Sequence, residues 1–153
     1  AVFQFVFRGL PIVALYPLFF PVSWPPTPVH WALFLWAVAV AMAVSFCWRF
    51  WVNLWAFWLV DAEGVGRYVW LTTGLLSGFM VPVAFFPDWL QALARFTPLP
   101  AIINTPVEVY LGVVTGPRLW AALGEQLAWL AGLALAGEWP YRLGRRRLTL
   151  QGG

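Results

Sequence analysis

Long runs of apolar residues dominate the chain, and four of them are long enough to cross a membrane as helices. A helix needs about 20 mainly apolar residues to cross a hydrocarbon core of about 30 Å. The qualifying stretches lie at about residues 2–21, 31–60, 67–86 and 118–141. The first is the weakest, because prolines at positions 11 and 17 would kink a helix or leave it re-entrant. The pattern predicts an all-α integral membrane protein with four transmembrane helices.

Residues 87–117, between the third and fourth stretches, are too apolar for an exposed loop, yet their prolines exclude one continuous helix. We expect two short interfacial or re-entrant helices instead, at about residues 88–96 and 101–114. Asp88 is expected to cap the first of them. The spacing of apolar residues predicts that one side of the second is formed by Ile103, Val107, Tyr110 and Val114.

Composition supports the membrane assignment. The chain is 62% hydrophobic and only 10% charged, whereas soluble domains carry about 25% charged residues. Cys47 is the single cysteine, which excludes an intrachain disulfide framework. All nine basic residues are arginines and the net charge is only +3, a balance that does not indicate nucleic-acid binding. The expected partner of this surface is the lipid bilayer.

The arginines also predict an orientation. Arg142 and residues 145–147 follow the fourth stretch directly, so the positive-inside rule places the C-terminus in the cytoplasm. Counting back, the polar sequence DAEGVGR at 61–67 becomes a tight turn at the cytoplasmic surface. The two short helices within 87–117 then face the outside.

No catalytic constellation is found among the residues. His30 is the only histidine and has no cysteine or acidic neighbour at metal-ligand spacing. Because the chain contains no lysine, it cannot supply the lysine of a phosphate-binding P-loop. We therefore expect a chain that is not an enzyme and that binds neither a metal nor a cofactor itself.

Polar residues inside the apolar stretches are candidates for a pathway or for polar helix contacts, because such residues are costly at membrane depth. They are Ser45, Arg49, Asn53, Thr72, Thr73, Ser77 and Glu125. Arg49 either takes part in a pathway or extends its head group to the membrane surface. The hydroxyls of the third stretch either border a route or bond back to their own helix. Glu125 and Gln126 are expected to face the short helices or a cavity rather than lipid.

Rows of small residues predict where helices approach closely in lipid. The third stretch carries a GxxxG pair, Gly74 and Gly78. The fourth carries a longer row at every fourth position, made of Gly124, Ala128, Gly132 and Ala136.

A series of short elements gives residues 61–153 a distinctive order and spacing. They are Ser77-Gly78, Pro82, Phe86-Pro87 with Trp89-Leu90, Pro98 to Pro100, Pro106, Tyr110 to Gly112, and the closing Gln151-Gly152-Gly153. In this order they resemble the C-terminal half of type-2 ABC exporter permeases, the membrane subunits of bacterial drug, lipid and polysaccharide exporters. Over residues 1–60 the similarity is one of hydropathy only.

The resemblance implies a six-span subunit with paired short helices outside, between the fifth and sixth spans. Residues 1–153 would form one membrane domain holding spans three to six, with the main ATPase-coupling segment upstream. ATP and Mg would bind to a partner ATP-binding subunit, and a second permease copy, identical or different, would complete the pathway in a bacterial cytoplasmic membrane. Candidate contacts on the cytoplasmic side are Asp61, Glu63 and Arg67. Candidates for an outer gate are Pro87, Asp88, Trp89, Asn104 and Glu108.

Two other functions stay open at this stage. An ion-coupled secondary transporter or channel usually places an ionisable residue deep in a span and often contains inverted repeats. A non-transporting membrane scaffold would need only the spans and their small-residue rows.

Overall fold

The computed structural model describes residues 17, 24, 25, 27–56 and 62–148. Within this part the chain is helical and contains no strands. The elements are α3 (Pro28–Ala56), α4 (Ala62–Leu76), a 3-10 turn η2 (Val83–Phe85), α5 (Asp88–Arg95), α6 (Asn104–Leu111) and α7 (Pro117–Leu148). The all-α prediction is confirmed.

Two of these helices are long and apolar enough to cross a membrane. They are the segment Pro28–Leu54 of α3, with a mean hydropathy of 2.0, and the segment Pro117–Gly137 of α7, with 1.3. They correspond to the second and fourth predicted spans. The first predicted span, at 2–21, lies outside the described residues except for Pro17, so four spans are not confirmed.

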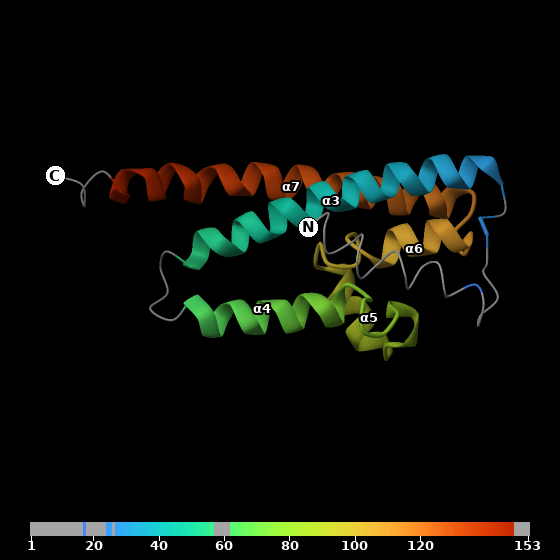
Figure 1. The fold of residues 1–153 in the computed structure, drawn as a ribbon, viewed down its shortest axis with the longest axis horizontal. Helices are drawn as coiled ribbons and strands as arrows, with labels where there is room; N and C mark the ends of the chain where they lie inside the picture. Colours follow the sequence, from blue (N-terminus) through green and yellow to red (C-terminus); the bar gives the residue numbers. More distant parts are fainter. Residues whose placement is uncertain (1–16, 18–23, 26, 57–61, 149–153) are drawn as a thin grey trace.

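α3 and α7 run side by side in the same direction (Figure 1). Near the start of both helices, Gln126 bonds to the carbonyl of Ala37. Further along, Gly137 lies against the ring of Phe50. The sequence separation between the two partners is nearly the same in the Gln126–Ala37 pair and in the Gly137–Phe50 pair. A constant separation is what two parallel helices in contact require. The face of α7 that packs against α3 holds the buried residues Leu119, Leu123, Gln126 and Leu133. Their successive spacings of four, three and seven positions place them on one stripe of a helix.

α4 differs from its prediction at both ends. It begins at Ala62, so the expected tight turn at 61–67 is largely helix, and it ends at Leu76 after 15 residues. At 1.5 Å per residue this is about 22 Å, short of a hydrocarbon core of about 30 Å. Gly78 stops the helix, because its φ of +85° belongs to the left-handed region. The continuous third span at 67–86 is therefore wrong.

The two short helices in the segment 87–117 are confirmed, with narrower bounds for the second. Asp88 does not cap α5 with its side chain: Pro87 holds the cap position and Asp88 opens the first turn. On α6 the buried residues are Thr105, Pro106 and Val109, whereas the predicted apolar side included the exposed Val107. Figure 1 shows α5 and α6 toward the end where α3 and α7 begin.

Candidate functional site

A groove of about 790 Å³ runs along one face of α3, where α6 and the turn before it approach. From α3 it is lined by Phe34, Val38, Ala41, Met42, Ser45, Phe46 and Arg49. From the other side it is lined by Ile102, Ile103, Pro106 and Val107. The α3 residues recur every three or four positions, so they form one stripe of the helix. Ile103 and Val107 of the predicted α6 face thus turn toward α3.

Aromatic rings close the groove at the end nearest the start of α3. The rings of Phe34 and Tyr110 meet edge to face, with centroids 5.1 Å apart. Trp31 packs edge-on against Tyr110 at 5.8 Å, and Trp24 lies 6.1 Å from Trp31. Edge-to-face pairs at these distances are favourable contacts that fix the angle between helices. The end of α6 is therefore packed against the beginning of α3. The start of α6 lies along the groove, toward the middle of α3.

The opposite end of the groove is polar. Ser45 and Arg49, two of the predicted pathway residues, both line it, and Arg49 is the one charged residue among the described residues that line the groove. Asn53, the third member of that stripe, is exposed one turn farther on and does not line the groove. Two of the three residues of the predicted stripe therefore line this groove, and their role in a pathway stays a prediction.

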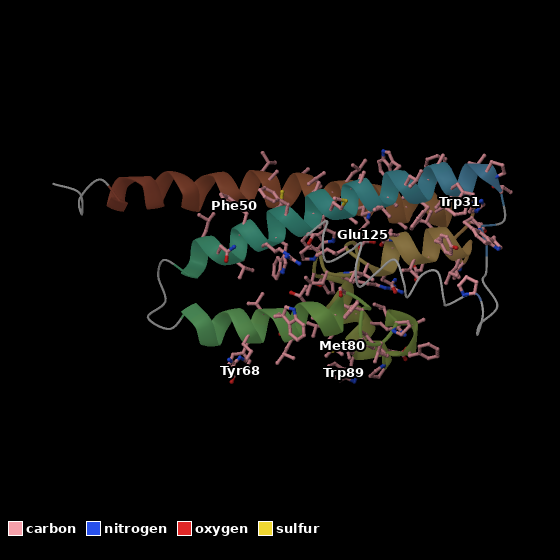
Figure 2. All side chains as sticks on the ribbon, viewed as in Figure 1. Trp31, Phe50, Tyr68, Met80, Trp89 and Glu125 are labelled. Atoms are coloured by element: carbon pink, nitrogen blue, oxygen red, sulfur yellow. The ribbon has the colours of Figure 1, made fainter. Side chains whose placement is uncertain are left out.

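Gln126 joins three parts of the fold. Its side chain is fully buried, with no exposed surface. The amide Nε2 donates to the carbonyl of Ala37 on α3 at 3.0 Å and to that of Ala101, before α6, at 2.8 Å. The amide Oε1 is buried and has no hydrogen-bond partner among the described residues. The sequence predicted that both Glu125 and Gln126 face the short helices or a cavity. This is confirmed for Gln126, whereas Glu125 is exposed on α7 and is labelled in Figure 2.

The hydroxyls of the predicted third span have three different roles. Thr72 donates back to the carbonyl of Tyr68 at 2.8 Å. Thr73 accepts the indole N–H of Trp48 at 3.1 Å and so links α4 to α3. Ser77 is fully buried and its hydroxyl reaches the carbonyl of Gly74 at 3.5 Å. The back-bonding interpretation holds for Thr72 and Ser77, and none of the three lines the groove.

The proposed outer-gate residues divide into two groups. Pro87, Asp88 and Trp89 are exposed at the start of α5, and Trp89 points away from the other helices (Figure 2). Asn104 and Glu108 lie half-buried on α6. The backbone N–H of Asn104 donates to the carbonyl of Ser77 at 3.1 Å, which ties the first residue of α6 to the end of α4.

Of the three candidate contacts on the cytoplasmic side, Asp61 lies outside the described residues. Glu63 and Arg67 belong to α4, and the Arg67 side chain is exposed. Because the helix has already begun, the expected tight turn does not form, and positions 63 and 67 lie one helical turn apart on α4.

Within the described part of the chain, neither small-residue row lies against one of the other long helices. A Cβ at Gly74 would lie 3.3 Å from the Cε of Met80 in the turn that follows α4, not against another long helix. Gly78 lies beyond the helix, so the two glycines do not form one helical row. Gly78 is nevertheless a point of close approach, because a Cβ there would lie 3.2 Å from the Cβ of Asn104 on α6. On α7, Gly124, Ala128, Gly132 and Ala136 are all exposed, and a Cβ at either glycine would meet nothing within 4 Å. This row faces away from α3, which the leucine and glutamine stripe contacts instead.

These features define a helical membrane protein built on two long parallel helices with a re-entrant-like segment between them. The chain belongs to the ABC-2 transporter family, because the model of the ABC-2 family transporter protein matches residues 2–152. It is thus a membrane component of transport rather than a catalytic subunit, as the resemblance over residues 61–153 implied. No match was found among curated proteins or among solved structures.

Proposed function

We propose that the chain is a permease subunit of an ATP-driven ABC exporter in a bacterial cytoplasmic membrane. It acts with a second permease copy and with a separate ATP-binding subunit that holds ATP and Mg. ATP-driven movement of the partner switches the helices between inward-facing and outward-facing packings, a rigid-body form of alternating access. Family membership over almost the whole chain is the observation that carries this proposal.

The direction of the helices supports the proposed orientation. α3 and α7 begin at the same end, and α5 and α6 lie toward that end (Figure 1). If the arginine-rich end of α7 lies in the cytoplasm, the starts of both long helices and the two short helices lie outside. Asp88, Trp89, Asn104 and Glu108 then surround the outer opening, and Arg67 lies on the cytoplasmic side, near the partner.

The exposed row on α7 supports pairing with a second permease copy. Gly124, Ala128, Gly132 and Ala136 leave an open, shallow strip on the face opposite α3. Small residues at every fourth position let the backbones of two membrane helices approach closely. No helix in the described part of the chain occupies this strip, so we assign it to the partner permease.

The direct test is purification of the full-length subunit from its native membrane. We expect a protein with a nucleotide-binding P-loop to co-purify, and its ATPase activity to rise when a transported substrate is added. A subunit that transports without any ATPase would support the secondary-transporter alternative. One that neither transports nor binds an ATPase would support the scaffold.

Cysteine labelling tests the orientation separately. In a Cys47→Ser background, Asp88→Cys and Asn104→Cys should react in intact cells with an impermeant thiol reagent, whereas Glu63→Cys should be protected. Trapping the ATPase with nucleotide should change the labelling of the outer pair. Equal labelling at 63 and 88 would contradict the orientation, and labelling that ignores nucleotide would contradict the gate.

A further inference from the structure

The groove beside α3 has an amphiphilic character that the transport proposal does not use. Arg49 stands at one end with Ser45 one turn away, and the other end is closed by Phe34 against Tyr110. The lining residues between these ends are aliphatic, aromatic or methionine side chains. A molecule that matched this surface would carry an anionic head and a long apolar body.

Arg49 has no partner for its charge among the residues that the structure describes. The side chain is exposed, and it forms neither a hydrogen bond nor an ion pair with any residue that the structure describes. A cation on an apolar membrane helix is costly unless an anion or water accompanies it. A guanidinium is well suited to a phosphate, because its planar fork donates two parallel hydrogen bonds to two oxygens.

The lining runs from Phe34 to Arg49, 15 positions or about 22 Å along α3, and its part between Val38 and Arg49 agrees in length with one leaflet of a bilayer. Val38 and Arg49 are 11 positions apart on α3, which corresponds to about 16 Å along a helix. Half of the hydrocarbon core measures about 15 Å. An acyl chain whose tail reaches the level of Val38 would therefore have its head group at the level of Arg49.

We propose that this groove binds an acyl chain of an anionic phospholipid from the surrounding bilayer, with the phosphate held by Arg49 and the Ser45 hydroxyl. Two other occupants are less compatible with the charge. Residues 1–23 of this chain are apolar but contain no aspartate or glutamate, and they carry an arginine of their own. A second copy would have to bring an acid to Arg49, and the disulfide test below distinguishes that occupant from lipid.

The test uses the full-length subunit in vesicles of phosphatidylcholine containing a trace of lipid with a photoreactive acyl chain. The probe is either phosphatidylglycerol or phosphatidylcholine, and cross-linked peptides are counted over residues 34–49. We expect phosphatidylglycerol to label this peptide about fivefold more than phosphatidylcholine, as one arginine near an anionic head group would give. Counting a single peptide removes the contribution of the arginine-rich tail.

Matched variants identify the source of this preference. Arg49→Gln should abolish it, Arg49→Lys should keep most of it, and Arg118→Gln, an exposed arginine outside the groove, should leave it unchanged. Met42→Trp should lower labelling by both lipids, because the exposed Met42 lines the groove and a larger ring would fill it. Millimolar glycerol phosphate should not compete, since a free head group lacks the acyl chain.

Three results would overturn the proposal. One is equal labelling by the two lipids in the unmodified protein, and another is an equal loss of preference in the Arg49→Gln and Arg118→Gln variants. The third is a disulfide between two copies through Met42→Cys without lipid labelling, which would assign the groove to a second copy. None of these measurements requires nucleotide or transport, so their failure leaves the exporter proposal intact.

Discussion

Replacing Gln126 tests whether the buried amide holds the segment before α6 against the two long helices. The side chain donates to the carbonyls of Ala37 and Ala101. Hydrogen bonds between membrane helices contribute about 0.6 kcal/mol on average and at most about 1.7 kcal/mol, so the pair contributes about 1–3 kcal/mol. The buried Oε1 opposes this gain, because an acceptor without a partner costs about 1–3 kcal/mol.

The two opposing terms make different substitutions distinguishable. Gln126→Leu removes both donated bonds and also the unsatisfied oxygen, so the free energy of unfolding should fall by only about 1 kcal/mol. Gln126→Glu keeps the oxygens, removes the donors, and places a carboxylate against two carbonyl oxygens. An uncompensated buried charge costs about 3–5 kcal/mol. The free energy of unfolding of Gln126→Glu should therefore be about 3 kcal/mol lower than that of the unmodified protein.

The assay is unfolding of the purified subunit by sodium dodecyl sulfate in mixed micelles, followed by tryptophan fluorescence. Glu125→Gln is the matched control, because the neighbouring side chain is exposed and surface changes are usually within about 0.5 kcal/mol. A Gln126→Glu variant as stable as the unmodified protein would refute the argument. So would a Gln126→Leu variant that is less stable than Gln126→Glu.

Three further experiments test other parts of the fold. Gly132→Leu should leave the melting temperature of a single subunit unchanged, since open space surrounds that position, but light scattering should show loss of the permease pair; an intact pair would assign the row to lipid. Gly78→Ala should lower the free energy of unfolding by about 1–2 kcal/mol, because Gly78 has a positive φ. Gly66→Ala, in open space on α4, should raise it by about 0.5–1 kcal/mol. Equal effects of the two substitutions would mean that the turn at Gly78 is not strained. Trp48→Phe removes the indole donor to Thr73 and also part of the packing of Trp48 against the core. It should therefore cost about 1 kcal/mol more in the unmodified protein than in a Thr73→Val background, where only the packing loss remains.

Hydropathy and prolines were sufficient to predict the two long helices and the two short ones. A run of apolar residues sets the length of α3 and α7, and prolines determine where α5 and α6 cannot continue. The break after α4 was missed, because Gly78 in a sequence is equally consistent with a close helix contact and with a left-handed turn. Only the backbone shows that φ is positive.

The site was predicted less completely than the fold. Ser45 and Arg49 were found because a polar stripe on an apolar helix is visible in the sequence. Gln126 was paired with Glu125 rather than separated from it, although the two side chains point in different directions on a helix. The available signal was the spacing of Leu119, Leu123 and Leu133, which places Gln126 and not Glu125 on the buried stripe.

The junction between α4 and α6 has an electrostatic consequence. The peptide dipoles of a helix leave about half a negative charge at its C-terminal end and half a positive charge at its N-terminal end. The carbonyl of Ser77 closes α4 and accepts the first N–H of α6, that of Asn104, so the two opposite partial charges meet and largely cancel. Broken helices in ion-coupled transporters leave such ends open, and there they bind substrate and ions. At this junction the two helix ends therefore offer little net field of their own to an approaching ion.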